Sequence, residues 1–158
     1  MSDVFTKRKR SEVMSRIRGR GNKETELALA KLLRAYGIAG WRRQQSIRLR
    51  ATMRRARRSR PTNIRTDFVF RRERVAVFVD GCFWHGCPKH ANMPASNRAF
   101  WKKKLTGNKF RDGFVTRQLR REGWRVIRIW EHELGQGSGQ ESEVRRQKVV
   151  ERIRRALR

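Results

Sequence analysis

The sequence predicts a single α/β domain in which a mixed β-sheet is flanked by helices. The chain has 158 residues, which is about the size of one domain with its own hydrophobic core. Apolar residues alternate between helical and strand spacing in the order helix, strand, hairpin, helix, strand, helix. No segment is repeated, and this order is typical of layered α/β folds.

A basic arm is predicted at the start of the chain, over residues 1–21. It contains a short helix from about Ser11, with Val13, Met14 and Ile17 as its few apolar residues, and glycines end this helix. Lysine and arginine outnumber acidic residues in the arm. We therefore expect it to contact a polyanion.

The central part of the chain, residues 22–134, begins with a helix. Asn22 is a good N-cap, and Glu24 and Glu26 place carboxylates in the first turn, where the helix dipole favours them. Gly37 ends the helix after a stripe of apolar residues at helical spacing: Leu29, Leu32, Leu33 and Tyr36.

An arginine-rich loop follows. From Leu27 to Thr66 the chain has no acidic residue, and arginines crowd the second half of this stretch. Because like charges repel, we expect residues 50–62, which include Pro61, to form an open, flexible insertion before the next strand. Such a run binds phosphates without reading sequence.

Two runs of β-branched and aromatic residues then predict a β-hairpin. They cover residues 63–70 and 74–79 and are separated by residues 71–73. The second run is apolar on both faces. It is therefore expected to be central in its sheet.

The last third of the chain predicts a helix, a strand and a second helix. The first helix covers about residues 110–122 and ends at Gly123, and the strand covers residues 124–130. A glycine-rich linker precedes an amphipathic helix over residues 140–158, which we expect to pack on the core.

The charge of the chain indicates a nucleic-acid partner. The formal net charge is +28 at pH 7, far beyond what solubility requires. No apolar run is long enough to span a membrane, and the five tryptophans could stack on bases. Two cysteines do not make a disulfide framework, so a metal pair in a reducing cytoplasm is the better interpretation.

The segment DGCFWHGCPKH, residues 80–90, predicts a zinc site. Cys82, Cys87 and His90 supply two thiolates and an imidazole within one loop. His132, just after the strand at residues 124–130, is the expected fourth ligand. The alternative is that these are ordinary surface and half-buried residues without a metal.

A second pair of residues predicts a magnesium site. Asp67 lies inside a strand, where aspartate is uncommon. The hairpin brings it across from residues 77–79, so Asp80 is expected at the same end of the sheet. Converging carboxylates are suited to Mg²⁺ and to phosphate chemistry. The alternative is that Asp67 caps a turn and Asp80 begins a loop.

His85 remains once zinc has its four ligands. It follows Asp80 by five residues, and imidazole can accept or donate a proton at neutral pH. The alternative for a single loop histidine is that it has no chemical role.

The aromatic residues of this region have two interpretations. Phe83 and Trp84, with Trp101 further along, could wedge between base pairs and kink a duplex. They could equally cover the zinc site as a small core of their own.

Four segments stand in a characteristic order after the basic arm: TDFVF, VAVFVDGCFWHGCPKH, NRAFWKKKLTGNKFRD and GWRVIRIWEHEL. With the arm, they cover the chain to about residue 134. In this order they resemble the very short patch repair (Vsr) endonucleases of bacteria. The combination is more specific than any single metal spacing.

The resemblance implies a restriction-endonuclease-like fold and a Mg²⁺-dependent enzyme with a structural Zn²⁺. The expected substrate is double-stranded DNA with a T:G mismatch left by deamination of 5-methylcytosine, nicked on the 5′ side of the thymine. We expect a cytoplasmic, nucleoid-associated monomer, with other mismatch-repair proteins as candidate partners. The competing hypotheses are a non-catalytic zinc-containing nucleic-acid binder and a restriction-type nuclease that cuts both strands.

The resemblance also implies roles for individual residues. Asp67 would be the main Mg²⁺ ligand, His85 the general acid or base, and Glu26 a contact to the metal-bound water. The four predicted zinc ligands keep their role. The residues implied to contact or wedge beside the mismatch are Met14, Phe83, Trp84, Trp101, Lys104 and Asn108.

Three departures from the family pattern concern the site. Thr66 stands where proline usually precedes the metal aspartate, and His132 stands where a cysteine is expected. Asp80 replaces a histidine, so it is either a second metal ligand or a support. The restriction-enzyme lysine after the second acid is absent, which fits a histidine in its place.

Overall fold

The computed structural model describes residues 25–49, 63–90, 93–94, 97–135 and 139–158. The basic arm with Met14, the N-cap candidate Asn22 and the insertion at residues 50–62 lie outside these ranges. The helical elements are α2 (Glu26–Ala35), α3 (Arg98–Arg121), the 3₁₀ helix η2 (Glu131–Leu134) and α4 (Gln140–Leu157). The strands are β1 (Trp41–Arg48), β2 (Asn63–Phe70), β3 (Val75–Asp80) and β4 (Arg125–Trp130).

The four strands form one mixed sheet in the order β1-β2-β3-β4. β2 is antiparallel to both β1 and β3, whereas β3 and β4 are parallel and are joined through α3. The predicted mixed α/β architecture is confirmed, and every residue of β3 is buried, as expected of a central strand.

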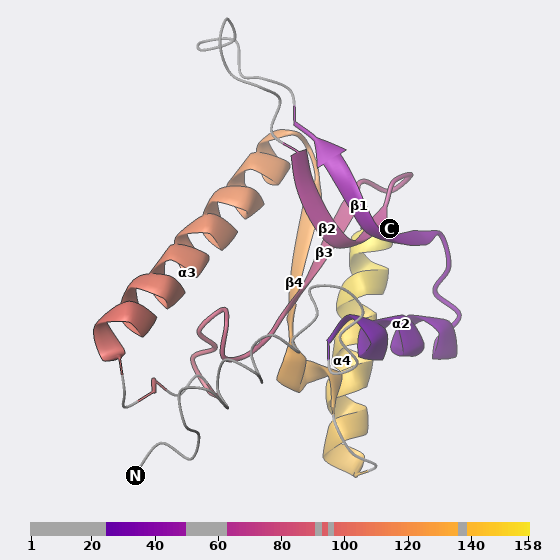
Figure 1. Cartoon of the computed structure of the whole chain (residues 1–158). Coiled ribbons are helices and arrows are strands. Elements are labelled where there is room, and N and C mark those ends of the chain that lie inside the picture. The colour runs from indigo at the N-terminus through magenta and orange to yellow at the C-terminus, as the bar shows by residue number, and fades with distance from the viewer. Residues whose placement is uncertain (1–24, 50–62, 91–92, 95–96, 136–138) are drawn as a thin grey trace, which may run out of the picture.

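Helices cover both faces of the sheet (Figure 1). Alternate residues of β3, such as Val75 and Val77, pack with α2 and α4, while Ala76 and Phe78 pack with Leu119 of α3. This alternation follows from the two-residue period of a strand. It produces two apolar layers, one on each side of β3.

The strands β2 and β3 separate part of the way along the sheet. Their pairing runs only from Phe70 opposite Val75 to Phe68 opposite Val77. Beyond that point β2 remains paired with β1 only, and β3 with β4 only. The sheet therefore forks at Asp67, the β2 residue immediately before the last pair.

The helix α3 is longer than the sequence predicted. The pattern predicted a helix from about residue 110, because Gly107 weakens the helical signal just before it. The structure has one continuous helix from Arg98, and its first turns are held by the buried side chains of Trp101 and Leu105. Tertiary packing overrides the local preference here.

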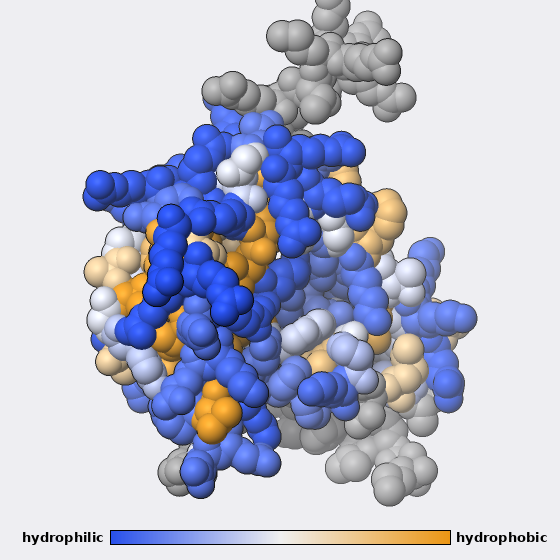
Figure 2. Space-filling model, turned by 180° about the vertical axis from the view of Figure 1, so that it is seen from behind, coloured by the Kyte–Doolittle hydropathy of each residue, from blue (hydrophilic) through white to orange (hydrophobic). Residues whose placement is uncertain are grey.

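The helix α2 begins at Glu26, with Thr25 as its N-cap residue, so Glu26 lies in the first turn as predicted. Figure 2 shows that hydrophilic residues cover most of the face behind the view of Figure 1, and apolar residues form smaller patches on it. No helix among the described residues combines the length and apolar character that crossing a membrane requires.

Candidate active site and metal centre

Asp67 lies at the fork between β2 and β3. One of its carboxylate oxygens accepts a hydrogen bond from the Val79 amide at 2.8 Å. Burial raises the pKa of Asp67 to about 6; the Val79 bond acts against this shift, and the carboxylates of Glu26 and Asp80 add to it. Among the described residues, no basic side chain forms an ion pair with Asp67. A carboxylate in these surroundings is stabilised by a cation.

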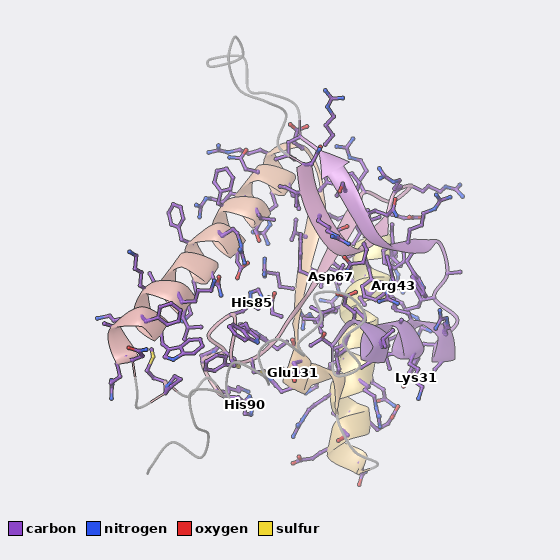
Figure 3. All side chains as sticks on the ribbon, in the orientation of Figure 1. Lys31, Arg43, Asp67, His85, His90 and Glu131 are labelled. Atoms are coloured by element: carbon purple, nitrogen blue, oxygen red, sulfur yellow. The ribbon has the colours of Figure 1, made fainter. Side chains whose placement is uncertain are left out.

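Glu26 approaches the same region from the first turn of α2. Its side chain is buried, and one oxygen lies 3.1 Å from the Arg43 guanidinium on β1. In the view of Figure 3, Asp67 lies between Arg43 and His85. Carboxylates from a helix and a strand therefore converge, and only the one on the strand has no cationic partner among the described residues.

Asp80 ends β3 and is 3% exposed. Arg128 of β4 binds it through two hydrogen bonds, Nε to Oδ2 and Nη2 to Oδ1, both at 2.6 Å. The sequence predicted Asp80 at the same end of the sheet as Asp67. The charge of Asp80 contributes to the raised pKa of Asp67, which agrees with this prediction. Both of its oxygens are occupied by Arg128, which favours the interpretation of Asp80 as a support.

His85 is oriented by a carboxylate from α3. Its Nδ1 lies 2.6 Å from Oδ2 of Asp112 and 3.6 Å from Oδ1 of Asp80. Burial alone would raise the pKa of Asp112, but the hydrogen bond to His85 and the charge of Arg128 lower it below the ordinary value of a carboxyl group. Asp112 is therefore ionised at neutral pH and holds the Nδ1–H side of the ring, which leaves Nε2 for proton transfer.

Asp112 and Arg128 are site residues that the sequence analysis did not identify. Asp112 is the single acidic residue between positions 98 and 121, within a strongly basic helix. Arg128 is a charged residue between two isoleucines of a strand. In both cases the available signal was a single charged residue of a kind that the surrounding sequence pattern does not predict.

The four predicted zinc ligands come together. The ligand atoms of Cys82, Cys87, His90 and His132 all lie within 4.8 Å of one another. The Nδ1 atom of His132 is 3.2 Å from the sulfur of Cys82 and 3.7 Å from that of Cys87, and the Nδ1 atom of His90 is 3.7 Å from Cys87. The loop after β3 and the 3₁₀ helix η2 therefore form one potential metal centre.

The surroundings of this centre suit a metal ion. Burial, and then the neighbouring His90, lower the pKa of His132, which favours the neutral imidazole that a metal binds. Burial raises the pKa of the Cys82 thiol, so a bound cation is needed to keep its thiolate form. Glu131 fixes the loop by accepting a hydrogen bond from the Cys82 amide at 3.0 Å.

Comparison with known proteins identifies the family. A family model described as DNA mismatch endonuclease Vsr matches residues 2–91. The chain belongs to the Vsr family. It is therefore a DNA endonuclease, as the resemblance in its sequence implied.

Relatives of this Vsr-family chain carry two kinds of name. It is 35% identical to the DNA mismatch endonuclease Vsr of Escherichia coli K12, over 83% of the chain and 74% of the relative. It is 36% identical to the type II nicking enzyme V.NmeDIP of Neisseria meningitidis serogroup C, over 84% and 80%. It is 50% identical to the type II nicking enzyme V.NaeI of Lentzea aerocolonigenes, over 44% of the chain and only 42% of the relative's length.

The candidate wedge residues of this Vsr-family chain form an aromatic cluster. The ring centroid of Phe83 lies 5.1 Å from that of Trp84 and 5.2 Å from that of Trp101, both in edge-to-face arrangement. Trp101 is buried, while Phe83 and Trp84 are half-buried. The rings are thus packed against one another, and a role as wedges between base pairs stays a prediction.

Two further predicted DNA contacts lie on α3, beside this cluster. Asn108 donates a hydrogen bond from its side chain to the Trp84 carbonyl at 2.8 Å, so it supports the aromatic loop. Lys104 is exposed and available to an anion. Met14, the remaining predicted contact, is outside the described residues.

Proposed function

We propose that the protein is a Mg²⁺-dependent endonuclease that nicks one strand of DNA on the 5′ side of the thymine in a T:G mismatch. The observation that carries the proposal is the half-buried carboxylate of Asp67, which has a raised pKa and no ion-pair partner among the described residues. The sequence resemblance and the name of the Escherichia coli relative support the mismatch as the substrate.

Asp67 is the residue that would hold Mg²⁺, with Glu26 close enough to contact its water shell. Mg²⁺ suits such oxygen donors and, when bound, polarises the scissile phosphate and stabilises the developing charge. Asp80, whose oxygens both bind Arg128, is assigned a supporting role. Asp67 would therefore be the principal protein ligand of the ion.

His85 moves a proton in this scheme. Asp112 accepts a hydrogen bond from the Nδ1–H group of the ring and stabilises the imidazolium, so Nε2 can take a proton from water or give one to the leaving oxygen. The arrangement is the one by which a carboxylate fixes tautomer and orientation of a catalytic histidine in other hydrolases.

We further propose that the Cys82, Cys87, His90 and His132 centre holds structural Zn²⁺. In tetrahedral coordination, with Zn–S of about 2.3 Å and Zn–N of about 2.0 Å, neighbouring sulfur and nitrogen ligands are about 3.5 Å apart. Three of the four sulfur–nitrogen pairs here are 3.2, 3.7 and 3.7 Å apart. The donor set and these distances therefore fit zinc, and four protein ligands leave no open position for catalysis.

DNA recognition is assigned to the aromatic cluster and its basic neighbours. Phe83 and Trp84 sit in a loop beside His85, so rings inserted next to a mismatched step would bring the scissile phosphate to the site. We also propose that residues 22–134 form a restriction-endonuclease-like core, that residues 1–21 contact DNA, and that the protein acts as a monomer in the nucleoid.

Cleavage of an end-labelled duplex tests this function. We expect a nick beside the thymine of a single T:G mismatch with Mg²⁺, and none with a chelator, with the matched T:A duplex or with Asp67→Ala. Binding of both duplexes without any nick would favour the zinc-containing binder. Paired cuts on both strands of a matched duplex would favour a restriction-type nuclease.

A further inference from the structure

Arg128 connects the two carboxylates that surround His85. Its guanidinium binds both oxygens of Asp80 at 2.6 Å, and its Nη2 lies 3.2 Å from Oδ1 of Asp112. The other oxygen of Asp112, Oδ2, is the one that meets His85 at 2.6 Å. Each carboxylate oxygen in this network therefore has a partner, and Nη2 of Arg128 lies between the two acids.

Two carboxylates lie near the His85 ring, and Arg128 makes one of them less available as the hydrogen-bond acceptor of that ring. Oδ1 of Asp80 is 3.6 Å from Nδ1 of His85, so a small movement of the ring would bring it into hydrogen-bond range. That same oxygen accepts the Nη2 donor of Arg128. With Asp80 saturated, Asp112 is the stronger acceptor for the ring.

Arginine is suited to this task by its shape. A guanidinium has donors in one plane, so it can bind Asp80 at two points and still reach Asp112, whereas a lysine ammonium is a single point of charge. Its plane is supported from below by Phe78, whose ring centroid lies 5.1 Å from the Arg128 Cζ atom. Arg128 is thus held in position by the carboxylates that it binds and by the ring of Phe78.

We propose that Arg128 is a positioning residue of the nicking reaction: it acts through Asp80 and Asp112, selecting Asp112 as the partner of His85 and keeping Asp80 away from the bound cation. This inference rests on the function proposed above. It also explains how an acid can occupy position 80 beside Asp67 and Glu26 without becoming an additional metal ligand.

The test compares four variants with the native protein: Arg128→Met, Arg128→Lys, Asp80→Asn and the double variant Asp80→Asn/Arg128→Met. Single-turnover nicking of the T:G duplex at saturating protein is measured separately from DNA affinity. We expect Arg128→Met to slow nicking roughly 10- to 100-fold, within the range that proton-transfer groups supply, with little change in affinity. Arg128→Lys should be intermediate.

The double variant distinguishes positioning from a purely structural role. Removing the carboxylate that Arg128 neutralises should restore nicking at least several-fold over Arg128→Met, because Asp112 is again the only acid beside His85. Melting temperatures of all variants identify unfolding. Nicking by Arg128→Met at the native rate, or no recovery in the folded double variant, would overturn the inference.

A measurement without DNA keeps this inference separate from the proposed function. The ring proton on Nδ1 of His85 can be followed by NMR in protein labelled with ¹⁵N-histidine, since the chain has three histidines and His85→Gln identifies the signal. We expect a hydrogen-bonded signal that Asp112→Asn abolishes and Arg128→Met shifts. An unchanged signal in Arg128→Met would contradict the positioning role, whereas a native protein that does not nick T:G DNA would contradict the function alone.

Discussion

At the scale of single residues, the site is distinguished by how its three converging carboxylates are compensated. Glu26 has Arg43 and Asp80 has Arg128, whereas Asp67 has the hydrogen bond from the Val79 amide and the charge of Arg128 at longer range, but no ion pair of its own among the described residues. The unfolded chain exposes Asp67 to water, whereas the folded chain removes part of that water. The proposed role of Asp67 as a metal ligand would therefore lower the stability of the fold, which is common for functional residues.

The first prediction concerns this conflict. The folded pKa of Asp67 is about 6 against an ordinary value of 3.8, so the folded chain binds the proton more tightly. Ionised Asp67 therefore lowers the stability of the Mg²⁺-free protein; the loss grows as pH rises from the ordinary value to 6 and is complete above 6. Asp67→Asn should raise the free energy of unfolding by about 1–3 kcal/mol at pH 8 and by much less at pH 4, while abolishing nicking.

Urea unfolding at both pH values, without Mg²⁺, measures this effect. Asp80→Asn is the matched control, because it breaks a buried ion pair with Arg128 and should destabilise the protein at pH 8. An equal gain for Asp67→Asn at both pH values would show that ionisation is not the cause.

The second prediction concerns the metal centre. His132→Ala should reduce bound zinc from one ion per chain to far less and lower the melting temperature by several degrees or more, because the ion links the loop after β3 to η2. His132→Cys should keep both, since thiolate is an equally good zinc ligand. Elemental analysis and thermal unfolding measure the two effects, and full zinc content in His132→Ala would exclude His132 as a ligand.

At the scale of elements, the central strands, the loop after β3 and the long helix α3 bring the site together. The sequence predicted the hairpin, the strand β4 and the zinc ligands, because β-branched runs and cysteine spacing are local signals. It did not predict the full length of α3, which depends on burial of Trp101, nor the pairing of His85 with Asp112, residues 27 positions apart. Contacts of that kind depend on packing, and a single sequence does not encode them locally.

The third prediction uses two glycines near this helix. A Cβ atom at Gly107, inside α3, would meet nothing within 4 Å, so Gly107→Ala should stabilise the protein by about 0.5–1 kcal/mol through helix propensity. Gly86 has φ +62°, and a Cβ there would lie 2.3 Å from the Lys109 side chain. Gly86→Ala should therefore destabilise the loop. Thermal unfolding compares the two, and a loss of stability in Gly107→Ala would indicate a role beyond helix formation.

At the scale of the whole molecule, the net charge of +28 exceeds what the described site uses. Ion pairs within the site use only a few arginines, among them Arg43, and eight other arginines between positions 42 and 60 contribute to the remainder. We therefore expect the charge to act mainly on DNA at large rather than on the mismatch. It should raise affinity for any duplex at the expense of selectivity.

The fourth prediction tests this effect. Replacing Arg54, Arg55, Arg57, Arg58 and Arg60 by glutamine should flatten the slope of log affinity against log salt by about 0.9 for each DNA phosphate that the variant no longer neutralises. Binding of matched DNA should weaken more than nicking of T:G DNA. Arg155→Gln and Arg158→Gln, at the far end of α4, serve as controls. An unchanged salt slope in the five-fold variant would show that this segment does not bind phosphates.

The fork in the sheet has a genetic consequence. The length of the turn at residues 71–74 determines which residues of β2 and β3 are paired, and therefore which residue lies at the fork. One codon inserted into or deleted from that turn would shift the register by one and direct Thr66 or Phe68, in place of Asp67, to the site. A reading-frame-preserving indel far from any catalytic side chain would thus inactivate the enzyme as surely as a substitution of Asp67, and the hairpin turn should tolerate changes of sequence but not of length.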